Sequence, residues 1–430
     1  MFSRNFSRAR FQRFMSQAIL KNPRILFLNR SYWPDSEATG QLLTALCEGL
    51  ADQFEIHVLA GQPNADGGQN WQDVHRRNGV TIHRVAHTTF SKNRLALKFV
   101  NFLSFIHAAR KRAQDIPAAD IVVFETDPFL LPFLAQRLQR KTNCRMVGYL
   151  QDIYPDVAVA LQKVRNNWAV RRLRTALFGI YRKCDRMIVL SRDMQQLLHD
   201  GGITAEQTAI IPNWADTSAI QPVDSENEFR RRYRLDGKFV VMYSGNLGLT
   251  QRLEEFVEAA GLLRDEQQIQ FVLIGRGARK QELQRQVAAL GLDNVLFLDY
   301  QPLHELSQSL CAADLHLVPL NRDLARCLMP SKVYGILAAG RPFLTNAPPG
   351  TEMYDLARSG RVGLTVPPGS PQEIALAVRK AREDREGLRQ MGVNARGLAE
   401  ERFTRDHAVS AFGRLLHEVV AGRHSGGASA

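Results

Sequence analysis

The chain has 430 residues, about twice the usual length of one domain, so two domains are expected. Hydrophobic residues make up 45% of it and charged residues 23%, which excludes a mainly disordered, collagen-like or coiled-coil protein. The five cysteines are scattered without CxxC spacing, so neither a disulfide framework nor a zinc site is indicated, and a reducing compartment fits. No apolar run approaches the roughly 18–20 residues that a membrane-spanning helix needs.

Positive charge is concentrated in the N-terminal half of the chain. The net charge is +13, and residues 1–34, 74–114 and 157–184 contain 7, 9 and 7 Lys or Arg, together 23 of the 56, without any Asp or Glu. Such segregation creates a local positive field, whose partner should be anionic lipid, nucleic acid or a phosphorylated substrate.

The N-terminal half has the pattern of a parallel α/β domain. Residues 1–23 form a basic extension, which suits a surface-lying helix, a transit peptide or an overlong start. Short apolar runs then alternate with helical stretches, and one helix is expected from about Leu42 to Asp52. We therefore predict a doubly wound domain over residues 24–212. Its predicted strands are residues 24–29, 55–61, 121–124, 145–150 and 186–191.

The C-terminal half repeats this alternation and predicts a second α/β domain over residues 238–403. Residues 213–237 contain Pro, Asn and acidic residues without periodicity, so we expect a linker there. A last helix, residues 404–422, is expected to cross back to the first domain, and residues 423–430 should form a disordered tail. The predicted strands are residues 238–246, 271–275, 295–299, 315–320, 341–345 and 363–366.

Loops that follow strands are candidate sites, because ligands in open α/β sheets bind at the carboxyl ends of the strands. In the first such loop, Thr39 and Gly40 just before the expected helix would allow close backbone approach to an anion or an acceptor sugar. The alternative is a glycine that serves only the turn. After the first strand of the second domain, Gly245 and Gly248 bracket Asn246, and backbone N–H groups there would cradle a diphosphate, although many strand-to-helix turns contain glycine.

Two later loops place charged side chains at expected helix starts. Ser331 is a candidate N-cap, and Lys332 follows it in the first helical turn, where the helix dipole disfavours a cation. A bound phosphate would reverse that effect; a solvated lysine is the alternative. Glu352 lies early in the next expected helix and either caps its backbone or accepts hydrogen bonds from ribose hydroxyl groups.

Eight motifs in this chain resemble, in order, those of the family 4 glycosyltransferases of the GT-B fold, close to the WbuB-like group of capsule, O-antigen and colanic-acid assembly. The resemblance covers roughly residues 24–420 and implies two facing Rossmann-like domains with a deep interdomain cleft. The motifs are SYWPDSEATGQ (31–41), YLQDIYPD (149–156), MIVLS (187–191), IIPNWAD (210–216), YSGNLG (243–248), LIGRGARKQEL (273–283), PSKVYGILAAGRP (330–342) and GLTVPPGS (363–370).

The resemblance implies transfer of a hexosyl or N-acetylhexosaminyl group, with retention of configuration, from a UDP- or GDP-linked sugar to a lipid-linked saccharide acceptor. The expected setting is cell-surface polysaccharide synthesis, with the protein in the cytoplasm and peripheral on the inner face of the membrane. No cofactor and no metal ion are expected, since the chain lacks a DxD motif. The departing diphosphate would instead be stabilised by backbone N–H groups and cations.

The resemblance also suggests roles for single residues. Asp152 and Lys332 are the candidate catalytic residues. Asp152 ends a strand of the first domain, where it would orient the acceptor hydroxyl or accept its proton; an Asx turn before Tyr154 is the alternative. Arg276 and Tyr300 are expected to contribute to donor binding, together with the glycine loop, Ser331 and Glu352.

One family motif is not kept. Many members carry two glutamates separated by seven residues, and the corresponding positions here are Cys327 and Gly335. Glu352 therefore becomes the candidate ribose ligand. Two other functions stay open, a sugar-nucleotide 2-epimerase on a similar fold and a non-catalytic, degenerate scaffold at the membrane.

A possible membrane contact lies within residues 91–114, where Leu95, Phe99, Phe102 and Ile106 have helical spacing amid six Lys or Arg and no acid. This composition is typical of a helix in the headgroup layer of an anionic membrane, and a core helix with solvated ends is the alternative. Nucleic acid is not expected as a partner, because the aromatic residues lie on the apolar stripe and not among the basic residues.

Overall fold

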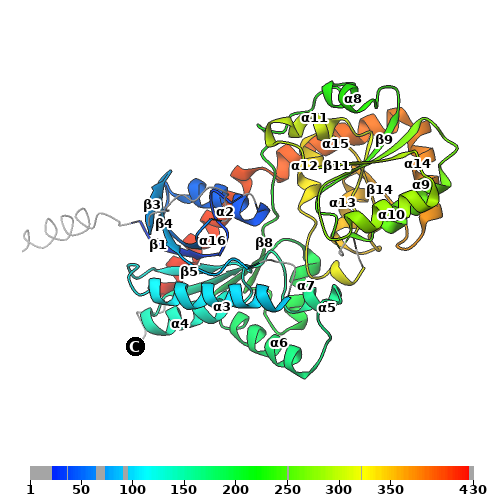
Figure 1. The fold of residues 1–430 in the computed structure, drawn as a ribbon. Helices are drawn as coiled ribbons and strands as arrows, with labels where there is room; N and C mark the ends of the chain where they lie inside the picture. Colours follow the sequence, from blue (N-terminus) through cyan, green and yellow to red (C-terminus); the bar gives the residue numbers. More distant parts are fainter. Residues whose placement is uncertain are drawn as a thin grey trace, which may run out of the picture. The chain divides into compact units, whose positions relative to one another are not determined.

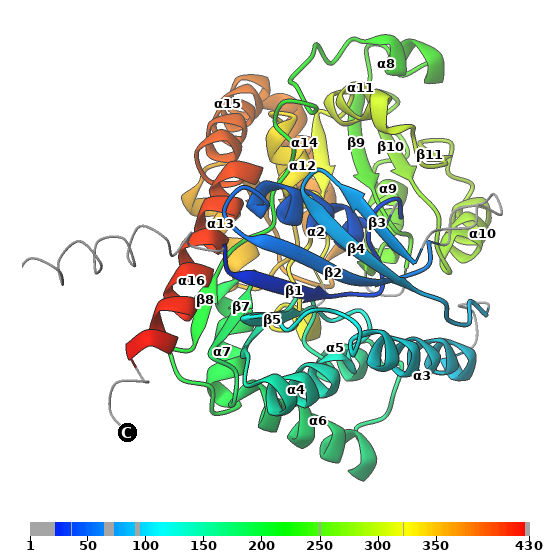
Figure 2. The same ribbon diagram turned by 90° about the vertical axis from the view of Figure 1, so that its left-hand side faces the viewer.

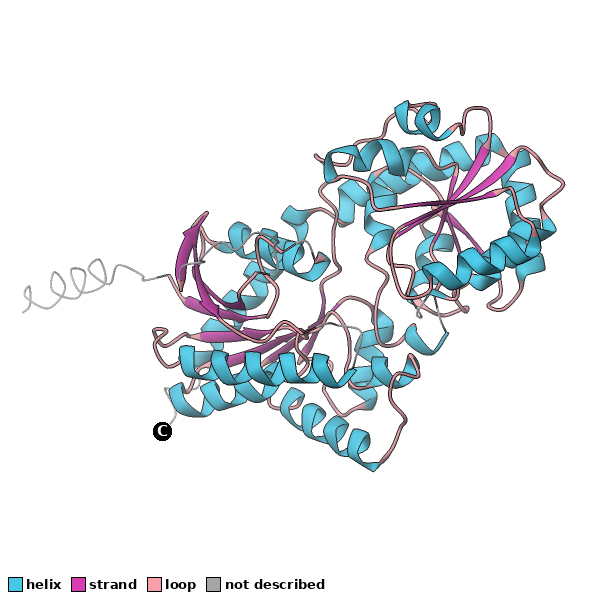
Figure 3. Cartoon of the chain, viewed as in Figure 1, coloured by secondary structure: helices cyan, strands magenta, loops and turns pink. Residues whose placement is uncertain are grey.

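The computed structural model describes residues 22–35, 37–63, 73–90, 95–248, 251–320 and 322–425. Within them lie two β-sheets flanked by helices (Figures 1 and 3). The chain divides into two compact units. The first comprises residues 1–124, 134–146 and 415–430, and the second comprises residues 125–133 and 147–414. Nearly all of the basic extension, and residues 426–430 of the predicted tail, lie outside the described residues, so those predictions stay open. The predicted tail is wrong at residues 423–425, which are helical.

The first sheet has eight strands in the order β3-β4-β2-β1-β5-β6-β7-β8, and β1, β2 and β4 are seen side by side in Figure 2. β1 pairs in parallel with β2 and β5, whereas β3 pairs antiparallel with β4. The strands are β1 (Arg24–Leu28), β2 (Glu55–Gly61), β3 (Val74–Arg77), β4 (Val80–Val85), β5 (Ile121–Phe124), β6 (Arg145–Tyr149), β7 (Arg186–Val189) and β8 (Thr208–Ile210).

All five strands predicted for this half are confirmed, and three others, β3, β4 and β8, were missed. β4 escaped the pattern because His83 and Arg84 are buried in it, where a parallel strand is normally apolar. The helices of this half are α2 (Ala38–Leu50), α3 (Leu95–Arg112), α4 (Leu131–Thr142), α5 (Asp156–Ala160), α6 (Trp168–Tyr181) and α7 (Arg192–Asp200).

The second sheet has six parallel strands in the order β11-β10-β9-β12-β13-β14, and all six were predicted. Counted from β9, this is the 3-2-1-4-5-6 order of a Rossmann-like fold, in which the strand order reverses between β9 and β12. Ligands bind at such a reversal. The strands are β9 (Phe239–Ser244), β10 (Ile269–Ile274), β11 (Val295–Leu298), β12 (Leu315–Leu317), β13 (Phe343–Thr345) and β14 (Gly363–Thr365).

β9 shows why its sequence is apolar at every position. Phe239, Val241 and Tyr243 belong to one hydrophobic cluster, which also takes in residues of α9 and α14. Val240 and Met242 belong to another cluster on the opposite face. Since successive side chains point to opposite faces and both faces are covered, the strand reads as one continuous apolar run.

The remaining helices cover this sheet and end the chain. The predicted linker, residues 213–237, contains a short helix, α8, whose Phe229 packs in the second of these clusters. From Leu415 onward, α16 belongs to the first unit, where the ring of His417 packs against Phe54. The helices are α8 (Glu228–Tyr233), α9 (Glu254–Leu262), α10 (Lys280–Leu290), α11 (Leu306–Cys311), α12 (Lys332–Ala338), α13 (Glu352–Ser359), α14 (Pro371–Glu383), α15 (Arg385–Arg402) and α16 (Arg405–Ser425), with short 3-10 turns at Leu303–Glu305 and Arg322–Leu324.

Candidate functional site

Two glycine-containing loops cross at the carboxyl ends of β9 and β10. The amide of Gly245 donates to the carbonyl oxygen of Ile274 at 2.9 Å. Gly275 and Gly277 have φ angles of 147° and 157°, and a Cβ atom at either position would overlap a carbonyl oxygen of the facing loop, that of Gly245 or of Leu247. The glycines are therefore required for the loops to approach each other, which is a structural reason for the pattern in addition to any ligand.

Lys332, the first residue of α12, lies against the first of these loops. Its Nζ atom is 3.7 Å from the centroid of the Tyr243 ring and 3.5 Å from Oε1 of Gln251, and a Cβ atom on Gly245 would lie 3.1 Å from it. Among the described residues, no carboxylate forms an ion pair with it. Burial without a counter-charge lowers the pKa of Lys332 to about 7. The structure thus brings together two residues predicted to act on the same diphosphate.

Other predicted donor residues lie around this pair. Asn246 and Gly248 are in the same loop, and the backbone oxygen of Asn246 accepts a hydrogen bond from the hydroxyl group of Tyr243 at 2.7 Å. Tyr300 is exposed beside the crossing, with its ring carbon 3.6 Å from the position of a Cβ atom on Gly275. Arg276 is also exposed, and its Nε atom lies 3.6 Å from Asp299.

Ser331 occupies the N-cap position of α12, as expected, but does not cap it with its side chain. Its backbone is helical, with φ of −62°, and its hydroxyl group makes no capping hydrogen bond. A capping side chain needs an extended backbone at that residue. Gly340, just after the C-cap residue Ala339, has φ of +63°, the left-handed conformation that favours glycine at a helix end.

Glu352 is the first residue of α13, and its carboxylate is occupied. Nε of Arg192 donates to it at 2.8 Å, while the other branch of that guanidinium group reaches Asp355 at 2.7 Å. The helix is capped by the side chain of Thr351, so the capping role considered for Glu352 is taken by its neighbour. Its own amide donates to Asp193 at 2.8 Å. A ribose would have to replace Arg192.

The loop after β6 contains Asp152, whose backbone forms an isolated antiparallel bridge with Leu328. The next amide, that of Ile153, donates to the carbonyl oxygen of Cys327 at 3.0 Å. Burial, assisted by the charges of Asp152 and Asp127, raises the pKa of Tyr154 above its usual range. Two carboxylates therefore lie near one tyrosine hydroxyl group at the carboxyl ends of β5 and β6.

Sequence reasoning missed the two acids that follow β5, Glu125 and Asp127. Glu125 is only 2% exposed, and neither of its carboxyl oxygens has a hydrogen-bond partner among the described residues. Burial, together with the nearby charge of Asp127, raises the pKa of Glu125 well above its usual range and so favours its neutral form. The signal was present, because both acids directly follow a predicted strand.

Thr39 and Gly40 belong to the first unit and are described there alone. The expectation that Gly40 precedes a helix is wrong, since α2 begins at Ala38. A Cβ atom on Gly40 would lie 2.5 Å from Oγ of Ser31, and its carbonyl oxygen accepts from Thr44 at 2.7 Å. The glycine therefore allows α2 to pack closely against the loop before it. Thr39 remains partly exposed.

Neither of the two positions that hold glutamates in many family members carries a carboxylate here. Burial raises the pKa of the Cys327 thiol to about 12. A Cβ atom on Gly335 would face the methyl groups of Leu310 and Ile220 at 3.7 and 3.8 Å. In the described part of the chain, no group of three or more His, Cys, Asp or Glu side chains is placed to hold a metal ion. None of the helices described is long and apolar enough to cross a membrane.

Comparison with known proteins agrees with this architecture. The family model "Glycosyltransferase Family 4" matches residues 39–219, and "Glycosyl transferases group 1" matches residues 224–398. The glycosyl transferase WcaI of Escherichia coli (strain K12), named for colanic acid biosynthesis, is 30% identical over 378 residues, 83% of this chain and 92% of that protein. A protein named as the glycosyltransferase WbjE of Pseudomonas aeruginosa is 25% identical over 304 residues, 70% of this chain and 75% of that protein.

Solved structures share the fold at low identity. Sucrose-phosphate synthase from Thermosynechococcus elongatus has a TM-score of 0.75 at 19% identity, covering 93% of this chain and all of that one. HepE from Anabaena, solved with UDP-glucose, has a TM-score of 0.70 at 19% identity, covering 92% and 99%.

Two Rossmann-like domains with these loops define a glycosyltransferase of the GT-B fold, which confirms the fold class predicted from the sequence. More specifically, the chain belongs to the family 4 glycosyltransferases. This finding favours the enzyme over the epimerase and the scaffold, the two alternatives that the sequence left open.

Proposed function

We propose that this chain transfers a hexosyl or N-acetylhexosaminyl group from a UDP- or GDP-linked sugar, with retention of configuration, to a lipid-linked saccharide during synthesis of a cell-surface polysaccharide. The name of WcaI, the relative at 30% identity, supports the polysaccharide setting, and the UDP-glucose complex of HepE supports a nucleotide-sugar donor. The observation that carries the proposal is the position of Lys332 against Gly245, at the reversal of strand order where a Rossmann-like sheet binds its ligand.

Lys332 and the backbone of the glycine loop would bind the diphosphate of the donor. A pKa of about 7 means that the free protein holds Lys332 partly neutral, and a dianionic diphosphate would restore its full charge. In the transition state the leaving diphosphate gains negative charge, which a fixed ammonium group and amide N–H groups stabilise most when water is excluded. The proposal assigns no step to a metal ion or cofactor, consistent with the lack of a DxD motif.

The remaining donor contacts follow from the same loops. Tyr300 and Arg276 would contact the base or the phosphates from the exposed side of the glycine crossing. Glu352 would accept the ribose hydroxyl groups after exchanging its partner Arg192. That exchange is feasible because the ion pair is partly exposed, and such pairs contribute only about 0–1 kcal/mol.

Asp152 is the proposed acceptor-side residue, where its carboxylate would orient the acceptor hydroxyl or accept its proton. Asp127 lies on the same side, since both acids act on the hydroxyl group of Tyr154.

The membrane part of the proposal rests on α3. Its exposed apolar side chains are Phe99, Val100 and Leu103, which are 45%, 43% and 48% exposed. The sequence also placed Phe102 and Ile106 on the apolar face expected to contact the membrane. Both are half-buried, because the side of α3 that carries them packs inward. The exposed face and the Lys and Arg residues at the end of α3 would lie in an anionic headgroup layer, peripheral on the inner face of the membrane.

The function is tested by incubating the protein with UDP- and GDP-sugars and with lipid extract. We expect release of free UDP or GDP together with a labelled lipid product whose anomeric configuration equals that of the donor. Inversion would contradict retention, conversion of the sugar nucleotide at C2 without acceptor would indicate the epimerase, and no turnover with any donor would indicate the scaffold.

The membrane contact is tested by sedimentation with vesicles. Binding to anionic but not zwitterionic vesicles, reversed by salt and weakened by Lys98→Glu, is expected. Lys92 and Arg94, which lie outside the described residues, are predicted to contribute in the same way. Binding that ignores both lipid charge and these substitutions would refute the membrane contact.

A further inference from the structure

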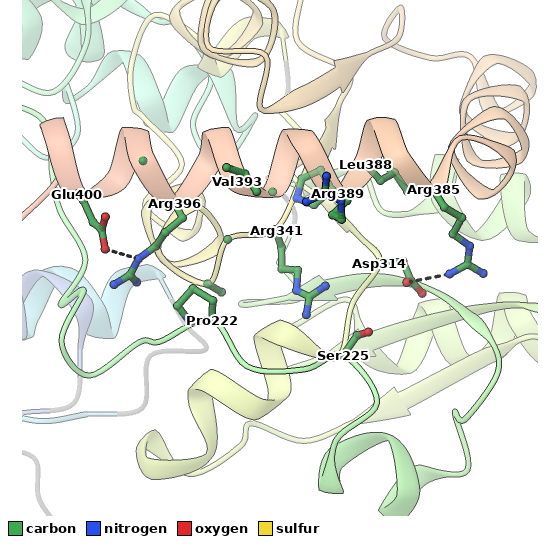
Figure 4. A pocket seen from close by; sticks show the side chains of 15 residues that line it. Pro222, Ser225, Asp314, Arg341, Arg385, Leu388, Arg389, Val393, Arg396 and Glu400 are labelled. Carbon is green, nitrogen blue, oxygen red and sulfur yellow. Dashed lines mark hydrogen bonds and ion pairs between the residues drawn. The ribbon is translucent and has the colours of Figure 1, made fainter.

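A pocket of about 680 Å³ lies at the edge of the second sheet opposite to the glycine loops (Figure 4). It is lined by Asp314, which precedes β12, by residues 339–342, which precede β13, and by one face of α15. Pro222 and Ser225, from the segment before α8, close another side. Since all strands of this sheet are parallel, their amino ends are here and their carboxyl ends are at the proposed donor site.

The lining of this pocket is rich in arginine. Four of its residues are arginines and two are acids. Asp314 is already neutralised by the buried Arg230, whose Nη2 atom lies 2.7 Å from it. The four arginines are Arg341, Arg385, Arg389 and Arg396, and the second acid is Glu400.

Two of the four arginines are fully engaged by the protein. Arg396 donates to the carbonyl oxygens of Ala338 and Ile220 at 2.6 and 2.8 Å and pairs with Glu400 at 2.6 Å. Arg389 forms a two-pronged pair with Glu386 on its own helix. Arg396 therefore holds the backbone and has little capacity for a ligand, whereas Arg389 is paired on the exposed surface of α15.

Arg341 and Arg385 are different. Arg341 has no ion pair among the described residues. Its Nη2 atom donates to the carbonyl oxygen of Val223 at 3.0 Å, and its Nε atom is buried without a hydrogen-bond partner in the part of the chain that the structure describes. Arg385 reaches an acid, Asp314, only at 3.4 Å. A buried donor without an acceptor destabilises the fold, so Arg341 is an unfavourable residue at this position unless a ligand supplies the acceptor.

We propose that this pocket binds the phosphate group of a small phosphorylated ligand, held by Arg341 and Arg385. A guanidinium group matches a phosphate with two parallel N–H donors, and the bond to Val223 already fixes the orientation of Arg341. No aromatic residue lines the pocket, so the phosphate is recognised and not a nucleobase. The site is distinct from the proposed donor site and does not depend on its assignment.

The experiment uses the full chain in a Lys332→Ala background, which removes the proposed diphosphate contact. Calorimetric titration with inorganic phosphate and with glucose 1-phosphate should show one site. Equal affinity for both probes would identify the phosphate group alone as the ligand, and tighter binding of glucose 1-phosphate would identify a sugar phosphate. Arg341→Gln combined with Arg385→Gln should weaken binding of both probes at least tenfold.

The control is Arg402→Gln, which removes one positive charge from α15 outside the pocket and should leave the affinity unchanged. A second variant keeps the arginines in place: Ser225→Glu adds a carboxylate at the pocket wall and should weaken binding at least tenfold, whereas Ser225→Gln should do so less than threefold. The proposal is overturned if neither probe binds in the Lys332→Ala background. It is equally overturned if the double arginine variant and Ser225→Glu bind as the parent does.

Discussion

The second unit contains two titratable groups, Lys332 after β12 and Glu125 after β5, whose pKa values are shifted in opposite directions by the same physical effect. Burial without a counter-charge lowers the pKa of the lysine to about 7 and raises the pKa of the acid well above its usual range. Each region therefore holds a group close to its neutral form. The lysine can gain charge when an anion arrives, and the acid can donate a hydrogen bond or release a proton, so the comparison separates an anion-binding region from a proton-handling one.

The largest expected effect is that of Lys332→Ala on donor binding. Loss of one charge-assisted hydrogen bond should weaken nucleotide affinity by about 1.5–3 kcal/mol, or about 10- to 150-fold. Calorimetry with UDP, GDP and their sugars measures it. Lys280→Ala is the matched control, because that lysine is already paired with Asp299 at 2.7 Å. If Lys332→Ala and the unsubstituted protein bind the donor with equal affinity, Lys332 does not contact the donor and its assignment is wrong.

The second prediction concerns how nucleotide affinity depends on pH through the titration of Lys332. Above about pH 7 the free protein holds Lys332 neutral, so binding of a diphosphate must take up a proton, and affinity should fall by up to about tenfold per pH unit between pH 7 and 9. Lys332→Arg should abolish this slope, since a guanidinium group stays charged. A slope that is identical in both proteins would mean that another group titrates.

The pH dependence of stability has a defined sign for the same group. Because the folded-state pKa lies below the unfolded value, the unfolded chain binds more protons between pH 7 and about 10.5. The contribution of Lys332 to the free energy of unfolding therefore rises with pH in that window and is flat below it. Chemical denaturation of the ligand-free protein, compared with Lys332→Ala, measures the difference.

Glu125 gives the pH dependence of the free energy of unfolding the opposite sign, and we expect its effect to be smaller than that of Lys332. Its folded-state pKa is raised, so the folded protein binds more protons above pH 4.5, and stability falls as pH rises through the folded-state value. Glu125→Leu should remove this dependence and stabilise the fold by about 1–2 kcal/mol, because an unpartnered acid is removed from the interior. Glu125→Gln, which keeps the polar group, should not stabilise. If denaturation shows Glu125→Leu to be destabilising, the acid has a partner in solution.

The smallest expected effect is at Glu352. If its carboxylate binds ribose, Glu352→Gln should raise the KM for the donor and weaken the binding of free UDP or GDP several-fold. Arg192→Ala should instead strengthen nucleotide binding, because it frees the carboxylate of Glu352. If the ion pair is only structural, both variants should lower the melting temperature by a similar amount and leave affinity alone. Calorimetry and thermal unfolding on the same preparations separate these outcomes.

Much of the architecture could be read from local pattern alone. The apolar runs of β9 and β10, bounded by Gly245 and Gly275, mark buried parallel strands because both faces of each are covered. The ordered motifs identified the family, and Lys332 stood out because a cation in the first turn of a helix needs an explanation. The helix start at Ala38 was not readable, since Gly40 looks like a turn residue until its contact with Ser31 is known.

From the sequence alone, the apolar strand runs determined the fold class, because strand burial acts over a few residues. The ordered motifs determined the family, and the resemblance implied that Lys332 and the glycine loop act on one diphosphate. Three properties were decided only by the tertiary structure. Arg192 forms an ion pair with Glu352, the carboxyl group of Glu125 has no hydrogen-bond partner among the described residues, and Arg341 lines a pocket with an unsatisfied N–H donor. These properties depend on atoms contributed by segments up to 160 positions apart. The pKa, burial and hydrogen bonding of each side chain depend on such distant neighbours, so they cannot be predicted from a local sequence pattern.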